Sequence, residues 1–289
     1  MRWPISGGVA AVAGKADHLA LEELWRLRRS AHRFMSKHAA IWWRGFSEGG
    51  VDVVVPPELA KLPPRQRFSA MAKAEQRRIV RSRLFQLDEA ACDAAATLGA
   101  KIRTAGHANA VARAGHPNVV ESFGITTPAP YGFLRWASPI GYGTTWGAPV
   151  RVCHWGPHDD ETSIIMWGDS DAVADAMIAM QPDLQPISEM LLDFTGPIYP
   201  ETSIPLGPSQ PAPAPNLAPA DIAAEQVDED IAMIYTIVAT WLLLTRPGAA
   251  TLTSHEPTPA QAAADRRAGL HHSEITHAAG TDLPDIVVL

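Results

Sequence analysis

The segment Val150–Asp169 reads VRVCHWGPHDDETSIIMWGD, and its pattern decides the fold class. Two short stretches, VRVCHW and TSIIMW, are rich in β-branched and aromatic residues, and they flank the polar stretch GPHDDE. Such an arrangement is typical of two antiparallel strands joined by a polar turn. We therefore predict a β-hairpin whose turn lies near Pro157–Glu161, with the carboxylates of the turn in water.

The residues around this hairpin indicate a small sheet and one short helix. The stretch GFLRWASPIG, Gly132–Gly141, has the same β-branched and aromatic character and predicts a further strand. We expect three or more antiparallel strands within residues 119–168. Asp169-Ser170-Asp171 predicts the start of a helix over Ala172–Met180, because aspartate and serine cap helix N-termini well.

Helices are predicted on the N-terminal side of the sheet. A stripe of mostly apolar residues at spacings of three and four predicts a helix over His18–Phe46; its members are Leu24, Leu27, Ala31, Phe34, His38, Ile41 and Gly45. A second helical region is expected from Arg65 to Arg103, with a new helix starting near Asp88. The glycine- and alanine-rich residues His107–Pro117 are interpreted as a loop.

The C-terminal side contains a proline-rich stretch followed by two predicted helices. Residues 196–219 hold eight prolines and are interpreted as an extended connector. The helix expected from Ile222 to Arg246 contains the apolar run Ile231–Thr245, which is shorter than the roughly 18 to 20 residues that span a bilayer. We therefore predict that it is buried in the protein and not in a membrane. Thr258-Pro259-x-Gln261 predicts a capped helix that ends near Gly269.

Together these patterns predict an α+β fold, with N- and C-terminal helices around a small antiparallel β-sheet. The chain divides into five segments, which are a disordered lead-in (1–17), a basic helical region (18–113), an antiparallel β region with a short helix (114–195), the proline-rich connector (196–219), and an apolar helix, a basic helix and a terminal strand (220–289).

Charge is distributed unevenly along the chain and indicates a basic binding region. Residues 1–113 hold 19 Lys and Arg against 10 Asp and Glu, whereas residues 114–289 hold 5 against 21. The stretch KAEQRRIVRSR places Lys73, Arg77 and Arg81 four residues apart, which is one face of a helix, and Arg78 lies beside them. A row of cations of this kind suits the phosphates of nucleic acid or an acidic protein surface. An alternative is that the row pairs with the acidic residues Asp228–Asp230 of the C-terminal part.

The polar turn also contains residue types that bind metals. Histidine and carboxylate side chains ligate divalent cations, and the turn region offers His154, His158, Asp159, Asp160 and Glu161. This order is similar to the HPDDE motif of zinc-dependent deacetylases, but Pro157 precedes His158 here, so the order is PHDDE. We favour the solvated turn over the metal site. The second histidine-rich stretch, His271–His277, is interpreted as an exposed linker.

Three segments resemble an uncharacterised family of actinobacterial proteins that are often carried by plasmids, prophages and phages. These segments are EELWRLRRSAHRFMSKHAAIWWRGFSEGGVD, ATWLLLTRP, and the basic helix followed by LPDIVVL. The resemblance implies a mobile-element context and no particular reaction. It covers the N-terminal third and residues 220–289.

We therefore expect a non-enzymatic accessory protein of a phage or plasmid that binds nucleic acid or a protein partner through its basic N-terminal third. A metal-dependent hydrolase that uses the residues from His154 to Glu161 is the alternative. No phosphate-binding glycine loop or dinucleotide fingerprint identifies a cofactor. The two cysteines, Cys92 and Cys153, fit a reducing cytoplasm.

Overall fold

The structure is a computed structural model of the 289-residue chain. It describes residues 8–48, 55, 57–112, 126–143, 147–158, 161–180, 189, 192–206 and 223–280.

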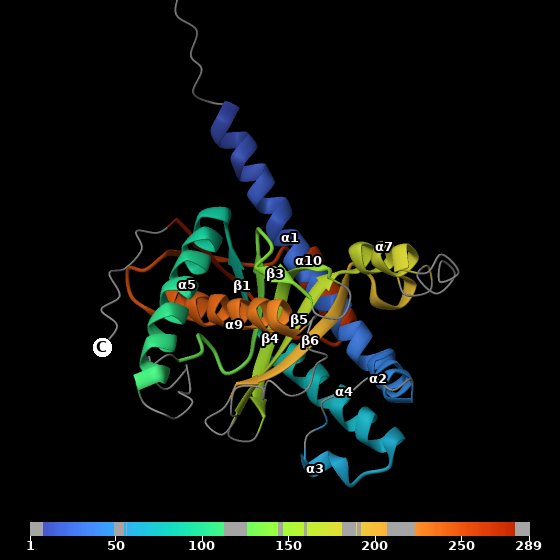
Figure 1. Cartoon of the computed structure of the whole chain (residues 1–289). Coiled ribbons are helices and arrows are strands. Elements are labelled where there is room, and N and C mark those ends of the chain that lie inside the picture. The colour runs from blue at the N-terminus through green and yellow to red at the C-terminus, as the bar shows by residue number, and fades with distance from the viewer. Residues whose placement is uncertain are drawn as a thin grey trace, which may run out of the picture.

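Helices and strands alternate along much of this chain (Figure 1). The helices are α1 (Gly8–Lys37), α2 (Ala39–Glu48), α3 (Pro57–Ala60), α4 (Pro64–Arg81), α5 (Glu89–Ala112), α7 (Ser170–Met180), α9 (Ala223–Thr245) and α10 (Pro259–Arg267). The strands are β1 (Arg83–Leu87), β2 (Gly132–Trp136), β3 (Gly141–Tyr142), β4 (Pro149–His158), β5 (Glu161–Asp169), β6 (Ile198–Leu206), β7 (Thr251–His255) and β8 (Ile275–Ala279).

Within the described residues, the strands form one mixed sheet of eight strands in the order β6-β5-β4-β2-β1-β8-β7, and β3 pairs with β4. The central strand β1 is parallel to both of its neighbours, β2 and β8. The remaining pairs are antiparallel. Parallel strands need helices on both faces of a sheet, because crossover connections run over those faces.

One face of the sheet is covered by α1 and α4, and we call it the α1 face. Its apolar residues belong to one buried cluster with residues of these two helices; the cluster includes Leu24, Leu27, Phe34, Ala72, Ile79, Leu84, Phe133, Val152, Ile165, Trp167 and Ile275. Alternate residues of each strand share a face, which is why Leu84 points here and Phe85 does not.

The other face, the α9 face, is covered by α5 and α9, and in Figure 1 α9 crosses the strands on the viewer's side. Trp155 of β4 contacts Trp241 of α9 with ring centroids 5.4 Å apart, and it stacks on Phe85 at 5.6 Å. Aromatic pairs of this kind contribute about 0.5–1.5 kcal/mol each beyond the area that they bury. Leu243 is fully buried in the same cluster.

A buried arginine of α1 connects three segments of the chain on the α1 face of the sheet. Arg28 is fully buried and donates to the carbonyls of Ile79, Val80 and His271, at 3.3, 3.0 and 3.1 Å. It therefore fixes α1 to the end of α4 and to the segment that leads into β8. Burial lowers the pKa of Arg28 to about 10, so the guanidinium is still charged at neutral pH.

The general α+β character and the antiparallel strands β2, β4 and β5 are confirmed. The prediction of a small antiparallel sheet is wrong, because the described strands form a mixed sheet of eight strands. The sequence pattern around Val150–Asp169 can reveal only strands that pair with a neighbour in the sequence. The parallel partners of β1 start at Gly132 and near Ile275, far away in sequence.

The N-terminal helices differ from the prediction in their bounds. Helix α1 begins at Gly8, so part of the expected lead-in is helical, and residues 1–7 lie outside the described residues. The expected helix over His18–Phe46 is two helices that meet at His38. The predicted helical region Arg65–Arg103 is interrupted by β1, although a helix does begin after Asp88, whose Oδ1 accepts from the Ala91 amide at 2.7 Å. Residues 107–112 of the predicted loop belong to α5.

Helices α7, α9 and α10 agree with the sequence signals. Asp169 caps α7 by accepting from the amides of Asp171 and Ala172, and Thr258 and Gln261 form the predicted capping box of α10. That helix ends at Arg267, and Gly269, two residues later, has a positive φ of 75°. Among the described residues, no helix is long and apolar enough to cross a membrane.

Two C-terminal predictions are wrong. Part of the expected connector forms β6, an edge strand that contains Pro200 and Pro205; proline fits an edge because no further strand needs its missing N–H. The histidine-rich stretch His271–His277 is not wholly a linker, because β8 begins within it at Ile275. The terminal residues DIVVL lie outside the described residues.

Candidate nucleic-acid interface

Helix α4 carries the predicted row of cations. It begins after Pro63 with proline at its first position and ends at Ser82, whose hydroxyl and amide both donate to the Ile79 carbonyl. Its buried residues recur at helical spacing, namely Phe68, Ala72, Glu75, Arg78 and Ile79. Because this side packs on the protein, the opposite side faces solvent, and Lys73, Arg77 and Arg81 are all exposed on it.

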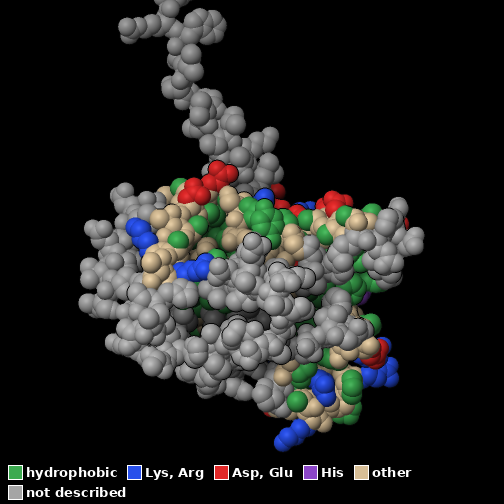
Figure 2. Space-filling model, in the orientation of Figure 1, with side chains coloured by type: hydrophobic (Ala, Val, Ile, Leu, Met, Phe, Trp, Pro, Cys, Tyr) green, Lys and Arg blue, Asp and Glu red, His purple; other side chains and the backbone are tan. Residues whose placement is uncertain are grey.

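The exposed charge of this region is of one sign. Between residues 61 and 83 the only acidic residue is Glu75, and it is buried. The exposed charged residues of the same stretch are Lys61, Arg65, Lys73, Arg77, Arg81 and Arg83. Figure 2 shows Lys and Arg side chains at the lower right of that view, with acidic side chains beside them, since the neighbouring helices α2 and α3 carry the exposed Glu48 and Glu58. Positive side chains of this kind attract polyanions and acidic protein surfaces.

The last cation of the row is held in place by an aromatic side chain. Arg81 donates from Nη1 to the Tyr131 hydroxyl at 3.2 Å, and its guanidinium carbon lies 5.6 Å from the centre of the Tyr131 ring. A guanidinium over an aromatic face is attracted by the electrons of the ring. The contact orients Arg81 beside the strand β2 without neutralising its charge.

Arg78, which the sequence groups with the row, lies apart from it. Its side chain is buried, and it donates to the Glu75 carboxylate and, at 3.1 and 3.3 Å, to the Pro157 carbonyl. Successive helical residues differ by about 100° in direction, so Arg78 points towards the sheet while Arg77 points to solvent. Arg78 therefore ties α4 to the β4–β5 hairpin and presents no charge for a phosphate.

His154, which the sequence groups with the metal candidates, belongs to the same buried network. Trp167 donates from Nε1 to His154 Nδ1 at 2.9 Å, and a tryptophan N–H can only donate. The proton of the ring is therefore on Nε2, which donates to Glu75 Oε2 at 2.9 Å. Both ring nitrogens are engaged and the side chain is fully buried, so His154 has no nitrogen to offer to a metal.

The remaining metal candidates are His158, Asp159, Asp160 and Glu161. The strand register pairs His158 with Glu161 at the end of β4 and the start of β5, and Asp159 and Asp160 lie outside the described residues. In the part of the chain that the structure describes, no three His, Cys, Asp or Glu side chains are grouped as a metal would require.

Cys153 and His154 point to opposite faces of the sheet, as neighbours on a strand must. Cys153 is buried on the α9 face, whereas His154 faces α4. Burial raises the pKa of the Cys153 thiol well above its ordinary value, so it stays protonated. The two residues therefore do not form a nucleophile and base pair.

The sequence reading missed the partners of these buried polar groups. Glu75 occupies the apolar stripe of α4 together with Phe68, Ala72 and Ile79, at spacings of four and three. This spacing could have placed the carboxylate inside the protein. Nothing in the sequence could have paired it with His154, which is 79 residues away.

The alternative that the row pairs with Asp228–Asp230 stays a prediction, because the side chains of these three residues lie outside the described part of the chain. The described residues of α9 from Met233 on pack on the α9 face of the sheet, whereas α4 packs on the α1 face. No protein-family model, curated protein or solved structure matches this chain.

Proposed function

We propose that this protein is a non-enzymatic accessory protein of a mobile element, a phage or plasmid, and that it binds nucleic acid in the cytoplasm through the exposed face of α4. The observation that carries the proposal is the row Lys73, Arg77 and Arg81, which has no exposed acidic residue beside it in residues 61–83. Arg78 is not part of this surface, because it is buried.

The row suits phosphates better than base edges. Successive cations lie about 6 Å apart along the axis, since an α-helix rises about 1.5 Å per residue. Phosphate contacts position a protein on nucleic acid and carry little sequence information. We therefore expect binding that depends strongly on salt and weakly on sequence.

The test is a titration of the intact chain with duplex and single-stranded DNA at several salt concentrations. Replacing Lys73, Arg77 and Arg81 with Ala should reduce the slope of log K against log salt by about 2 to 3, because each phosphate contact contributes about 0.9 on duplex DNA. The matched control replaces Arg33, Lys37 and Lys101, three exposed cations outside α4, and should leave the slope nearly unchanged. Absence of binding at about 50 mM salt, where phosphate contacts are strong, would refute the proposal. Equal slopes for the two variants would place binding elsewhere.

The alternative, a metal-dependent hydrolase, has less support. It would have to rely on His158, Asp159, Asp160 and Glu161 alone, because both nitrogens of His154 are engaged. Metal analysis of the purified protein separates the two readings, since only the hydrolase requires a stoichiometric metal.

A further inference from the structure

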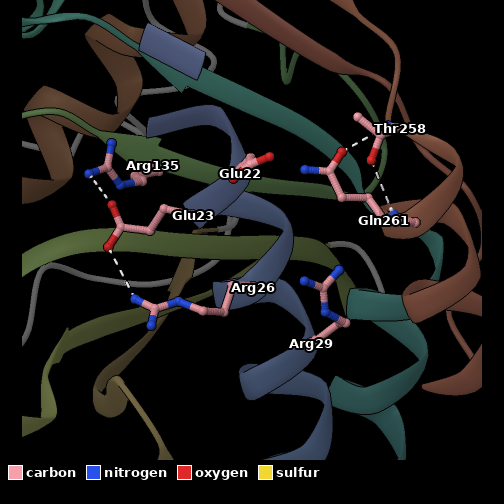
Figure 3. A pocket seen from close by; sticks show the side chains of 8 residues that line it. Glu22, Glu23, Arg26, Arg29, Arg135, Thr258 and Gln261 are labelled. Atoms are coloured by element: carbon pink, nitrogen blue, oxygen red, sulfur yellow. Dashed lines mark hydrogen bonds and ion pairs between the residues drawn. The ribbon is translucent and has the colours of Figure 1, made fainter. Parts of the chain in front are cut away.

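Two groups of arginines on this protein differ in whether their charge is compensated. A pocket with a volume of about 700 Å³ lies between α1, β2 and the start of α10, and Figure 3 shows three arginines in its wall. Arg26 and Arg135 pair with Glu23, at 3.5 and 2.6 Å. Arg29 pairs with the buried Asp265 at 2.7 Å. The positive charges of this pocket are therefore compensated by carboxylates of the chain itself.

The row on α4 has no such compensation. Among the side chains that the structure describes, no carboxylate forms an ion pair with Lys73, Arg77 or Arg81. The row also ends beside an aromatic side chain, because Arg81 contacts Tyr131, a partly exposed residue just before β2. Exposed cations beside an exposed aromatic ring are the combination that binds single-stranded nucleic acid.

Tyr131 is held in place from three directions. Its hydroxyl accepts from Arg81, and its carbonyl accepts from the Arg83 amide at 3.0 Å. The edge of its ring lies over Gly156 of β4, where an added Cβ atom would be 2.8 Å from Tyr131 Cδ1. Only glycine leaves room for the ring at this point. The ring therefore has a fixed orientation at the surface before a ligand arrives, which lowers the entropy cost of stacking on it.

We propose that the ligand of this surface is single-stranded nucleic acid, and that one unpaired base stacks on Tyr131 while phosphates of the same strand contact Lys73, Arg77 and Arg81. Bases of a single strand can turn out and stack on aromatic side chains, whereas in a duplex their faces are covered by neighbouring bases. This inference rests on the proposed function, because it names the class of nucleic acid that the row binds.

The test measures the affinity of the full chain for three labelled probes by fluorescence anisotropy. The probes are an oligothymidylate of about 20 nucleotides, which is longer than a usual single-strand site, an abasic strand of the same length, and a duplex of the same length. The oligothymidylate should bind most tightly. The abasic strand has the same phosphates but no bases, so the difference between the two strands reports on stacking alone.

Tyr131→Leu should weaken binding of the oligothymidylate about five- to a hundredfold, the loss expected when a side chain that stacks on one base is removed. It should not weaken binding of the abasic strand, which has no base to stack. The slope of log K against log salt should stay the same, because the substitution removes no charge. This separates Tyr131 from the cations of the row, whose replacement lowers the slope.

Tyr142→Leu is the matched control, because Tyr142 is an exposed tyrosine of β3 that lies outside the row. It should bind all three probes like the unmodified chain. Tyr131→Phe keeps the ring and loses only the hydroxyl that Arg81 contacts, so it should retain most of the affinity that Tyr131→Leu loses.

The outcomes distinguish this inference from the proposed function. If the unmodified chain binds neither the single strand nor the duplex, the proposed function fails and the inference fails with it. If the chain binds and the triple Ala variant of α4 lowers the slope, but the oligothymidylate binds no more tightly than the abasic strand or the duplex, only the inference fails. The inference also fails if Tyr131→Leu binds the oligothymidylate like Tyr142→Leu.

Discussion

At the scale of single residues, the most informative feature is a polar network that is closed inside the protein. Arg78, Glu75, His154 and Trp167 are hydrogen-bonded in series between α4 and the sheet. A buried carboxylate is tolerated only where donors surround it, and here each oxygen of Glu75 has one. The network thus holds residues that sequence patterns assign to binding or catalysis.

Arg78→Ala should lower the free energy of unfolding by about 3–5 kcal/mol, because it removes one partner of a buried ion pair and leaves Glu75 short of a donor. The neighbouring Arg77→Ala should change it by no more than about 0.5 kcal/mol, as is usual for an exposed site. Urea unfolding of both variants gives the comparison. Similar small losses for the two would contradict the buried network.

At the scale of elements, α5 and α9 pack closely against each other at Gly99. A Cβ atom placed on Gly99 would lie 3.0 Å from the Tyr235 carbonyl oxygen and from the Thr236 amide nitrogen. Glycine therefore lets the two backbones approach each other over the α9 face. The following residue, Ala100, is exposed on the same helix.

Gly99→Leu should lower the free energy of unfolding by about 1–3 kcal/mol, because the added side chain forces the two backbones apart. The gain in helix propensity, about 1 kcal/mol, offsets only part of this cost. Ala100→Leu adds the same side chain on the solvent side of the helix. Its free energy of unfolding should differ from that of the unmodified chain by no more than about 0.5 kcal/mol. Chemical denaturation measures both. If the two substitutions lowered the free energy of unfolding by equally small amounts, this would contradict the close packing of α5 on α9.

Elements whose signals are local could be predicted from the sequence, and elements that depend on distant partners could not. The hairpin of β4 and β5, the Asp169 cap and the capping box of Thr258 all follow from neighbouring residues. Strand β1 has five residues between two helices, and only its pairing with β2 and β8 makes it a strand. The same limit applies to the candidate site: the exposure of Lys73, Arg77 and Arg81 follows from helical spacing, whereas the burial of His154 depends on Glu75.

At the scale of the whole molecule, one sheet collects strands from the first third, the middle and the C-terminal part of the chain. Strand β1 lies inside this sheet with neighbours on both sides, and helices cover both faces. Strand β7 lies at the end of the strand order, and four of its five residues are exposed.

Amide hydrogen exchange should therefore be slowest in β1 and much faster in β7, because exchange of a buried, doubly paired strand needs opening of the core. Mass spectrometry of peptides that cover residues 83–87 and 251–255 measures the difference. Strand β8, paired on both sides and adjacent to β7, should resemble β1 and serves as the internal reference. Equal protection of β7 and β1 would contradict this order of strands.

The pairing of β1 with β8 has a consequence for synthesis of the chain on the ribosome. Asp88, just after β1, accepts from the amide of Gly280, which is 192 residues further along. One edge of β1 thus stays without its partner until β8, residues 275–279, has emerged, and contacts of such long range form slowly. Unpaired strand edges and exposed apolar surface are what molecular chaperones protect in nascent proteins. We expect the nascent chain to need such protection for longer than a protein whose central strands are neighbours in sequence.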